Sequence, residues 1–321
     1  MIAFIFPGQA SQTVGMGKAL ADAFPEAREA FAEADAAFDR SAAAAEGRSL
    51  SEIVWNGPDE QLRLTEIQQP GILAVSVAAY RVLAAQGLLP SMVAGHSLGE
   101  YSANVAAGTF AFGDAVRIVQ RRGRYMQEAV PVGQGAMAAI LGADLETVRK
   151  ACEEAAAGEV VSPANINCPG QIVIAGAAGA VARASERVKA LGAKRALPLP
   201  VSAPFHSALM LPAEARLEPE LRDLGVQAPR VPIVANVDAK PKREAWSAIE
   251  ALVQQVSAPV RWEDVIRRLA SEGVNTYVEV GPGTVLSGLV KKIHKDAHIT
   301  HFGSPEDLAA VVAACSISAE K

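Results

Sequence analysis

A serine flanked by glycines is the first feature of this sequence that could carry chemistry. The stretch Gly95-His96-Ser97-Leu98-Gly99 fits the pattern G-x-S-x-G, with apolar SMVA before it and helix-like LGEYSANVAA after it. This context is typical of a nucleophile elbow, in which a sharp strand-to-helix turn exposes a serine in a strained conformation. The alternative is an ordinary tight turn whose serine caps the following helix.

A serine needs a base to become a nucleophile, and the sequence contains five histidines. His206 lies in VSAPFHSALM, where Pro204 predicts a loop just before a helical pattern. Catalytic residues are common on such loops in α/β folds, although a histidine there could also cap or pack against the helix. His96 adjoins Ser97 on the turn and is expected to point elsewhere. The remaining histidines lack a supporting pattern, and the first of them lies in the basic run KKIHK, typical of a solvated face: His294, His298 and His301.

Acyl chemistry also needs donors for a developing oxyanion. The backbone N–H of Leu98, at the start of the helix after Ser97, is one candidate. Gln9, in FPGQASQ, directly follows the first predicted strand. The carboxyl ends of parallel strands meet at one edge of a sheet, so Gln9 could lie close to Ser97, or it could be a polar turn residue.

A run of arginines, RRGRYMQ, occupies residues 121–127. For Arg121 and Arg124 a solvated face is the expected interpretation. Arg122 adjoins Gly123, whose missing side chain permits close approach of a backbone or ligand. A guanidinium directed into an acyl pocket could bind a carboxylate in bidentate fashion.

The elements around these residues predict an α/β fold with a mostly parallel sheet, because strand-length apolar runs alternate with helical patterns. We expect strands at IAFIF, MVAG, VPIVAN, TYVEVG and HITHFG. We expect helices at 15–24, 25–39, 70–86, 98–107, 113–129, 207–224, 244–256, 260–272, 283–294 and 305–315. Pro70 suits the first turn of its helix, and the Ala-rich stretch 41–45 is expected to be a loop.

Between 131 and 199 the order of predicted elements changes to β-α-β-β-α-β, the ferredoxin-like arrangement. The sequence therefore predicts a large catalytic subdomain of residues 1–130 and 200–321. A ferredoxin-like subdomain of residues 131–199 is inserted into it.

Composition limits the classes of function. The protein has 321 residues and a formal net charge of -5, which argues against non-specific binding to nucleic acid. It has no apolar run long enough to span a membrane, and its N-terminus MIAFIFPGQ lacks the features of a signal peptide. The cysteines form no C-x-x-C pair and no metal-ligand spacing: Cys152, Cys168 and Cys315. We therefore expect a cytoplasmic protein without a metal site or a membrane partner.

Several segments together resemble the malonyl-CoA:acyl-carrier-protein transacylases of type II fatty acid synthesis, to which acyltransferase domains of polyketide synthases are related. The matching segments are FPGQASQ, GHSLGEYSA, RRGRYMQ, NINCPGQIVIAG, SAPFHS, VSAPVRWED and EVGPGTVL. They occur in the family's order and spacing, and they extend over essentially the whole sequence. The large subdomain is accordingly expected to be α/β-hydrolase-like.

The resemblance implies a role for each candidate. Ser97 would be the acylated nucleophile, His206 the base, and Arg122 the partner of the malonyl carboxylate. Gln9 and the Leu98 amide would form the oxyanion hole. In this family an oxygen near a glutamine orients the histidine, and that position is occupied by Gln255. Asn165 and Asn167 match an asparagine-rich loop at the subdomain edge and would support the pocket.

Two positions near the site affect the conformation of a turn and the choice of acyl group. The family usually has PGQGSQ, and Ala10 replaces the middle glycine here, which would be strained if that turn requires a positive φ. Phe205 in SAPFHS favours malonyl over methylmalonyl by resemblance, since its bulk would crowd an α-methyl group.

The resemblance implies transfer of malonyl from malonyl-CoA to the phosphopantetheine thiol of acyl carrier protein, without a further cofactor. Alternatives are the malonyl transferase of a malonate decarboxylase or polyketide system and a serine hydrolase. A scaffold that has lost the chemistry would also lack Ser97 or His206, and both are present. Against a hydrolase, no Asp or Glu partner for the histidine and no HGGG-type loop occur in the expected order.

Overall fold

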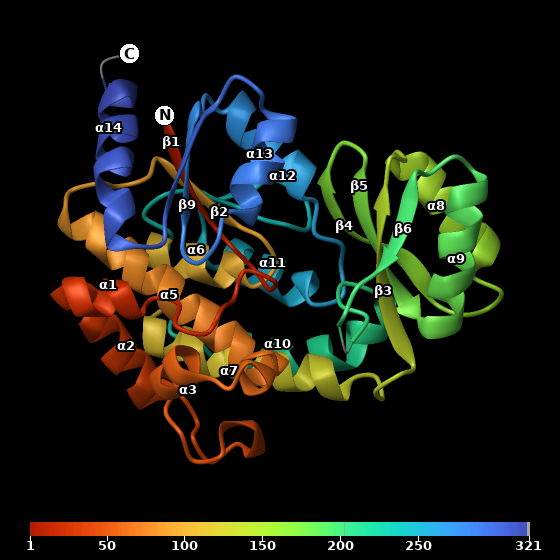
Figure 1. Ribbon diagram of the computed structural model, residues 1–321, viewed down its shortest axis with the longest axis horizontal. Coiled ribbons are helices and arrows are strands. Elements are labelled where there is room, and N and C mark those ends of the chain that lie inside the picture. The colour runs from red at the N-terminus through yellow and green to blue at the C-terminus, as the bar shows by residue number, and fades with distance from the viewer. Residues whose placement is uncertain (202, 320–321) are drawn as a thin grey trace.

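The computed structural model describes residues 1–201 and 203–319 (Figure 1). The protein begins with a strand and a helical region: β1 (Ile2–Phe6), α1 (Lys18–Ala23), α2 (Pro25–Ala37), α3 (Leu50–Asn56), α4 (Asp59–Leu62), α5 (Thr65–Ala85), β2 (Met92–Gly95), α6 (Gly99–Ala107) and α7 (Phe112–Glu128). After the small subdomain it continues with α10 (Leu211–Arg222), β7 (Ile233–Val234), β8 (Pro241–Lys242), α11 (Ala245–Gln255), α12 (Trp262–Ser271), β9 (Thr276–Val280), α13 (Val285–Ile293), β10 (His298–Phe302) and α14 (Leu308–Ala319).

Within the described residues, the large sheet has the strand order β10-β9-β1-β2-β7-β8. All its neighbouring strands are parallel except β7 and β8, which are antiparallel. β1 lies in the middle of this sheet between β9 and β2, so the segments after β1 and after β2 emerge side by side. The predicted mostly parallel α/β sheet is thus confirmed.

Helices cover both faces of the sheet. Successive side chains of β1 point to opposite faces and pack against different helices. Phe4 and Phe6 pack into the core with α2, α5 and α7, whereas Ala3 and Ile5 pack into the core with α12 and α13. A strand buried on both faces needs apolar residues at every position, which explains the continuous run IAFIF.

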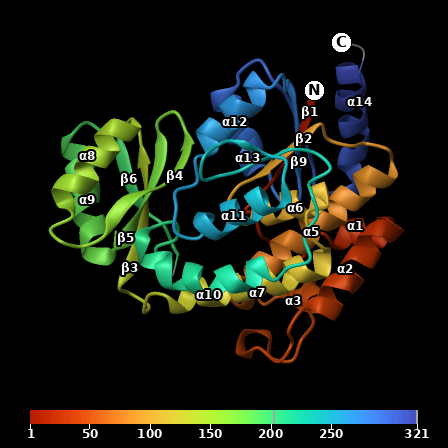
Figure 2. The same cartoon turned by 180° about the vertical axis from the view of Figure 1, so that it is seen from behind.

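The small subdomain is a separate antiparallel sheet with the strand order β4-β5-β3-β6. Its elements are β3 (Gly135–Leu141), α8 (Leu145–Ala155), β4 (Val161–Cys168), β5 (Gln171–Ala177), α9 (Ala178–Ala190) and β6 (Arg195–Pro198). This order and its β-α-β-β-α-β sequence are those of the ferredoxin-like arrangement, which confirms the predicted fold class. Figure 1 shows α8 and α9 on the side away from the large subdomain, and Figure 2 shows the same from behind.

The small sheet contacts the large subdomain along β4. The segment after α11 runs beside β4, where Val260 N donates to Ala164 O at 2.9 Å and Ile166 N donates to Val260 O at 2.9 Å. Helices α12 and α13 also contact β4. The inserted subdomain is therefore held against the large one by backbone hydrogen bonds as well as by packing.

Two predicted boundaries and one predicted loop differ from the structure. Helix α5 begins at Thr65, so Pro70 lies inside the helix instead of in its first turn. Proline removes one helical hydrogen bond there, and the packing of α5 against α2 and α7 outweighs this loss. The strand at VPIVAN shortens to Ile233–Val234, because Asn236 N donates away from the sheet to the Glu100 carboxylate. In the stretch 41–45, Ala43–Ala45 form a short 3₁₀ turn.

Among the helices of residues 1–201 and 203–319, none combines the length and the hydropathy that a membrane span requires.

Candidate active site

Ser97 lies on the tight turn that joins β2 to α6. Its φ of 51° is in the left-handed region, where a serine is strained. A Cβ at Gly99 would lie 2.0 Å from Phe6 O, and a Cβ at Gly95 would lie 1.9 Å from the carbonyl carbon of Gly99. Both flanking positions therefore require glycine, which is the physical reason for the G-x-S-x-G pattern at this turn.

The fold brings His206 to Ser97 across 109 residues of sequence. His206 Nε2 is 2.7 Å from Ser97 Oγ, and His206 Nδ1 is 2.9 Å from the backbone oxygen of Gln255. A carbonyl oxygen only accepts, so Nδ1 carries the proton and Nε2 is free to accept from the serine hydroxyl. Burial and the positive charge of Arg122 lower the pKa of His206 to about 3, so its imidazole is neutral at pH 7.

Arg122 is fully buried on α7 and is directed at the same serine. Its Nη1 donates to Gln69 Oε1 at 2.7 Å, and its Nη2 donates to Gln255 Oε1 at 2.9 Å and to Ser97 Oγ at 3.2 Å. Within the described residues, these acceptors are all neutral, and Arg122 Nε is buried without a hydrogen bond. A buried cation surrounded by neutral acceptors is suited to receive an anion.

Gly123 allows α7 to come this close to its neighbour. A Cβ at Gly123 would lie 2.5 Å from Thr65 O, so the start of α5 and α7 are in backbone contact there. This is the close approach predicted from the adjacent glycine. Arg121 and Arg124, on the other faces of α7, are partly exposed and pair with Glu220 and Glu66, as the solvated interpretation predicts.

Gln255 connects the other residues of the site. Its backbone oxygen faces His206, and its side-chain oxygen accepts from Arg122. Its Nε2 donates to Ser97 O at 2.9 Å and to Glu100 Oε2 at 2.8 Å. The histidine is therefore oriented by a backbone carbonyl and not by an aspartate.

The candidate oxyanion donors lie at this edge of the sheet. Helical hydrogen bonding in α6 begins with Gly99 N, which donates to His96 O at 2.9 Å, so the Leu98 amide one residue earlier is not used by the helix. Gln9 follows β1, and its side-chain amide donates to Gln68 Oε1. The next residue, Ala10, has a φ of 76°, so the turn does require the conformation that a glycine would adopt more easily.

Asn165 and Asn167 lie on strand β4, not on the loop that the resemblance implied. The strand continues through them because β4 pairs with both β5 and the segment at Val260. Asn167 Oδ1 is 2.9 Å from Nε2 of His96, so the His96 ring points away from Ser97, as predicted.

Phe205 is buried in the main core directly before His206. The prediction of a solvated His294 was wrong, since its Nδ1 lies 3.1 Å from the Tyr277 hydroxyl and the residue is half-buried.

Three polar residues of the site were missed from the sequence. Asn236 Oδ1 accepts from Ser97 N at 2.7 Å, Glu100 accepts from Asn236 N at 3.1 Å, and Gln69 holds Arg122. Glu100 resembles an ordinary acidic residue in the first turn of a helix, and Asn236 follows a strand without a recognisable motif. The one usable signal was the pair of glutamines before Pro70 in a mostly apolar helix.

Ser97 lies on a nucleophile elbow and is hydrogen-bonded to a histidine. The α/β sheet that carries it has a ferredoxin-like insertion. These features place the protein in the class of the acyltransferases. The family described as acyl transferase domain matches residues 3–314. A malonyl CoA-acyl carrier protein transacylase of Escherichia coli strain K12 is 51% identical over 311 residues, which are 97% of this protein and 98% of the relative. With this family match and this identity, the chain belongs to the acyltransferase family of the malonyl CoA-acyl carrier protein transacylases.

Solved structures agree with this family. An acyl carrier protein S-malonyltransferase from Vibrio cholerae superimposes with a TM-score of 0.92 at 46% identity, covering 97% of this protein and 99% of that one. A malonyl-transacylase solved in complex with a type II PKS acyl-carrier protein also gives a TM-score of 0.92, at 45% identity and with the same coverage.

Proposed function

We propose that this protein transfers the malonyl group from malonyl-CoA to the phosphopantetheine thiol of acyl carrier protein and so supplies fatty acid synthesis. The intermediate is a malonyl ester of Ser97. One observation carries the proposal: a fully buried guanidinium with only neutral acceptors lies 3.2 Å from the Oγ of an elbow serine. This arrangement suits an acyl group that itself carries a carboxylate.

In the first half-reaction, Ser97 Oγ attacks the thioester carbonyl carbon while its proton moves to His206 Nε2. The carbonyl π electrons move to oxygen, and the oxyanion is held by Gln9 and the backbone amide of Leu98. When the tetrahedral intermediate collapses, the C–S bond breaks and the CoA sulfur takes the proton from His206. The malonyl group is left on Ser97, and its carboxylate pairs with Arg122.

In the second half-reaction the same groups act in reverse. His206 removes the proton from the phosphopantetheine thiol, and the sulfur attacks the malonyl ester. Collapse breaks the C–O bond, and Ser97 Oγ recovers the proton from His206. Because the protein supplies the base and the oxyanion donors, the reaction needs no metal or further cofactor, and a chelator is expected not to slow it.

The test is mass spectrometry of the protein after brief incubation with malonyl-CoA. A single malonyl adduct is expected, and peptide mapping should place it on the peptide that contains Ser97. Addition of acyl carrier protein should then remove the adduct and produce the malonylated carrier. An adduct on another residue, or its release only to water, would contradict the proposal, and the second outcome would favour the hydrolase alternative.

Replacing Arg122 by alanine is expected to remove the preference for a charged acyl group. Loss of one partner of a buried ion pair costs roughly 3–5 kcal/mol, or about two to four powers of ten. Loading from malonyl-CoA should fall by that factor, and loading from acetyl-CoA, which has no carboxylate, should fall much less. The measurement is kcat/KM for both thioesters.

The matched control for Arg122 is Arg121→Ala. Arg121 is the adjacent residue on α7 but is partly exposed and pairs with Glu220. The Arg121→Ala variant should load from malonyl-CoA and from acetyl-CoA at rates near those of the unmodified protein. Equal losses for malonyl-CoA and acetyl-CoA in Arg122→Ala would instead indicate a general structural role.

The pH profile of loading should lack an acid limb near pH 6.5 that arises from His206. The lowered pKa of His206, about 3, keeps the base neutral as the pH falls, so kcat/KM should not decline on its account between about pH 8 and pH 5. Burial raises the pKa of Glu100 to about 7, so the profile should also be measured in Glu100→Gln. A limb near pH 6.5 that persists in that variant would contradict the assigned state of His206.

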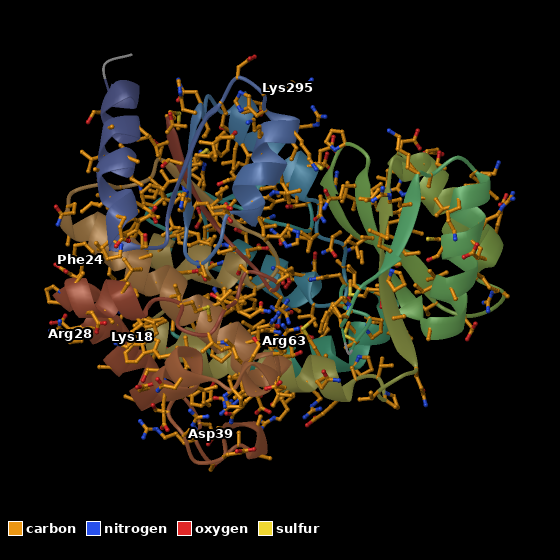
Figure 3. The ribbon with its side chains drawn as sticks, viewed as in Figure 1. Lys18, Phe24, Arg28, Asp39, Arg63 and Lys295 are labelled. Atoms are coloured by element: carbon orange, nitrogen blue, oxygen red, sulfur yellow. The ribbon has the colours of Figure 1, made fainter. Side chains whose placement is uncertain are left out.

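The carrier is expected to be an acidic protein that docks on exposed basic residues of the small subdomain. Lys194 and Arg195, at the start of β6, are exposed and precede the loop to His206. Lys189, close by at the end of α9, already pairs with Glu186. The basic run KKIHK begins on α13 and ends at Lys295, two residues after that helix (Figure 3).

Charge reversal at Lys194 and Arg195 is therefore expected to slow transfer to the carrier but not loading from malonyl-CoA. Exposed charges mainly change the encounter rate and are screened within about 8–10 Å at physiological salt, so transfer should also slow as salt rises. Charge reversal at Arg149 and Lys150, exposed on α8, is the control. Salt-insensitive transfer, or an unimpaired double variant, would exclude this docking surface.

A polyketide carrier is the second candidate acceptor, because the neighbour in complex with a type II PKS carrier superimposes as closely as the Vibrio cholerae enzyme. Transfer rates to a fatty-acid carrier and to a polyketide carrier would distinguish the two contexts. Faster transfer to the polyketide carrier would overturn the assignment to fatty acid synthesis.

We further propose that the protein works in the cytoplasm. The three cysteines are buried and unpaired, as expected in a reducing compartment. Cell fractionation that recovers the protein in an oxidising compartment would contradict this.

A further inference from the structure

Glu100 is a buried carboxylate that the reaction described above does not use. It lies three residues after Ser97 on α6 and is 1% exposed. Its Oε2 accepts from Gln255 Nε2 at 2.8 Å and from Asn236 N at 3.1 Å. A buried carboxylate is costly, so its contacts with two residues of the site call for a physical explanation.

The two partners of Glu100 hold the two backbone polar groups of the nucleophile. Asn236 Oδ1 accepts from Ser97 N at 2.7 Å, and Gln255 Nε2 donates to Ser97 O at 2.9 Å. Ser97 has a φ of 51°, a conformation that persists only when its surroundings impose it. Glu100 thus anchors both residues that impose it.

Glu100 also determines which way the Gln255 amide faces. With its nitrogen toward Glu100 and Ser97 O, the amide presents its oxygen to Arg122 Nη2 at 2.9 Å. A flipped amide would present its oxygen to the carboxylate of Glu100 and its NH2 group to the guanidinium, and both contacts would be repulsive. The carboxylate and Ser97 O therefore both favour the amide orientation in which Gln255 holds Arg122 beside the serine.

We propose that Glu100 is a positioning residue, whose carboxylate oxygen aligns Gln255 and Asn236 and through them sets Ser97 and Arg122 for malonyl transfer. The proposal rests on the roles assigned above to Ser97 and Arg122. The role requires an acceptor oxygen at the position of Glu100 Oε2, since both hydrogen bonds come from N–H donors. A glutamine oxygen can accept both, whereas an aspartate carboxylate is shorter by one methylene.

Glu100→Gln and Glu100→Asp distinguish the effect of side-chain length from the effect of charge. The first keeps the acceptor and loses the charge, and the second keeps the charge and withdraws the acceptor. Glu100→Gln should stay within about threefold of the unmodified protein in kcat/KM for malonyl-CoA. Glu100→Asp should lose about 10- to 100-fold, the equivalent of leaving a buried donor unpaired. Its ratio of malonyl to acetyl loading should also fall, because Arg122 loses its contact with Gln255 and keeps only Gln69.

The matched control is the same pair of substitutions at Glu279. Glu279 is also fully buried and accepts from Leu286 N and Ser287 N at the start of α13, on a strand that β1 separates from β2. Glu279→Asp should lower the thermal midpoint without changing the ratio of malonyl to acetyl loading. This comparison separates loss of a buried hydrogen bond in general from loss of this one.

Several results would overturn the proposal. An unchanged malonyl-to-acetyl ratio in Glu100→Asp would show that Glu100 does not act on Arg122. If Glu100→Gln lost activity while Glu100→Asp kept it, the charge of the side chain and not its length would be required. If the unmodified protein forms no malonyl adduct on Ser97, the proposed function itself is wrong, which is a separate outcome.

Discussion

Ser97→Ala is expected to abolish the malonyl adduct completely and to lower transfer to the carrier by about a millionfold. Removal of a nucleophile from a serine-dependent site costs about this factor, and the remaining rate comes from binding and oxyanion stabilisation. Alanine also removes no contact that the fold needs, because the backbone of Ser97 is held by Asn236 and Gln255. The measurements are intact mass after incubation with malonyl-CoA and the rate of carrier malonylation.

Ser102, on the helix that follows Ser97, offers a control. Ser102 is fully buried on α6, and its hydroxyl makes no hydrogen bond within the described residues. Ser102→Ala should retain the adduct and most of the transfer rate. A Ser97→Ala protein that still carries malonyl would mean that a different residue is acylated.

His206→Ala is expected to slow adduct formation by about 10³- to 10⁶-fold, since the serine loses the base 2.7 Å from its oxygen. The two residues act as a unit, so the double variant with Ser97→Ala should be no slower than Ser97→Ala alone. The measurements are the rate of the first turnover with malonyl-CoA for His206→Ala and the rate of carrier malonylation for the double variant, since Ser97→Ala forms no adduct.

His96→Ala is the stringent comparison for His206, because His96 adjoins the serine in sequence. Its ring contacts Asn167 and packs against Trp262, so it is not placed to take the serine proton. The loss of activity in His96→Ala should be far smaller than the loss in His206→Ala. Near-normal transfer in His206→Ala would show that another histidine is the base.

Local patterns predicted the elements that carry the chemistry. The elbow follows from steric limits within a few residues, since only glycine fits at 95 and 99. The ferredoxin-like insertion follows from the order of its strands and helices, because short connections and antiparallel pairing leave few other arrangements. The position of β1 next to β2 likewise brings Gln9 to the edge of the sheet where Ser97 lies.

Local patterns failed where a distant contact sets the boundary. Helix α5 begins before Pro70 because its first turns pack against neighbouring helices, and these turns hold Gln68 and Gln69 beside the site. β7 is short because Asn236 leaves the sheet to contact Ser97 and Glu100. Neither contact has a signature in the residues next to it.

The sequence by itself determined the class of fold, the strained serine and the types of residue available for catalysis, because these depend on steric limits and periodicity over short segments. The tertiary structure decided which of those residues meet. Ser97, Arg122, His206 and Gln255 come from separate segments, and only packing of the sheet and its helices brings them within hydrogen-bond distance. The same packing removes water from the site, and this burial lowers the pKa of His206 and leaves Arg122 among neutral acceptors. Desolvation is a property of the whole fold, so no local pattern could have predicted it.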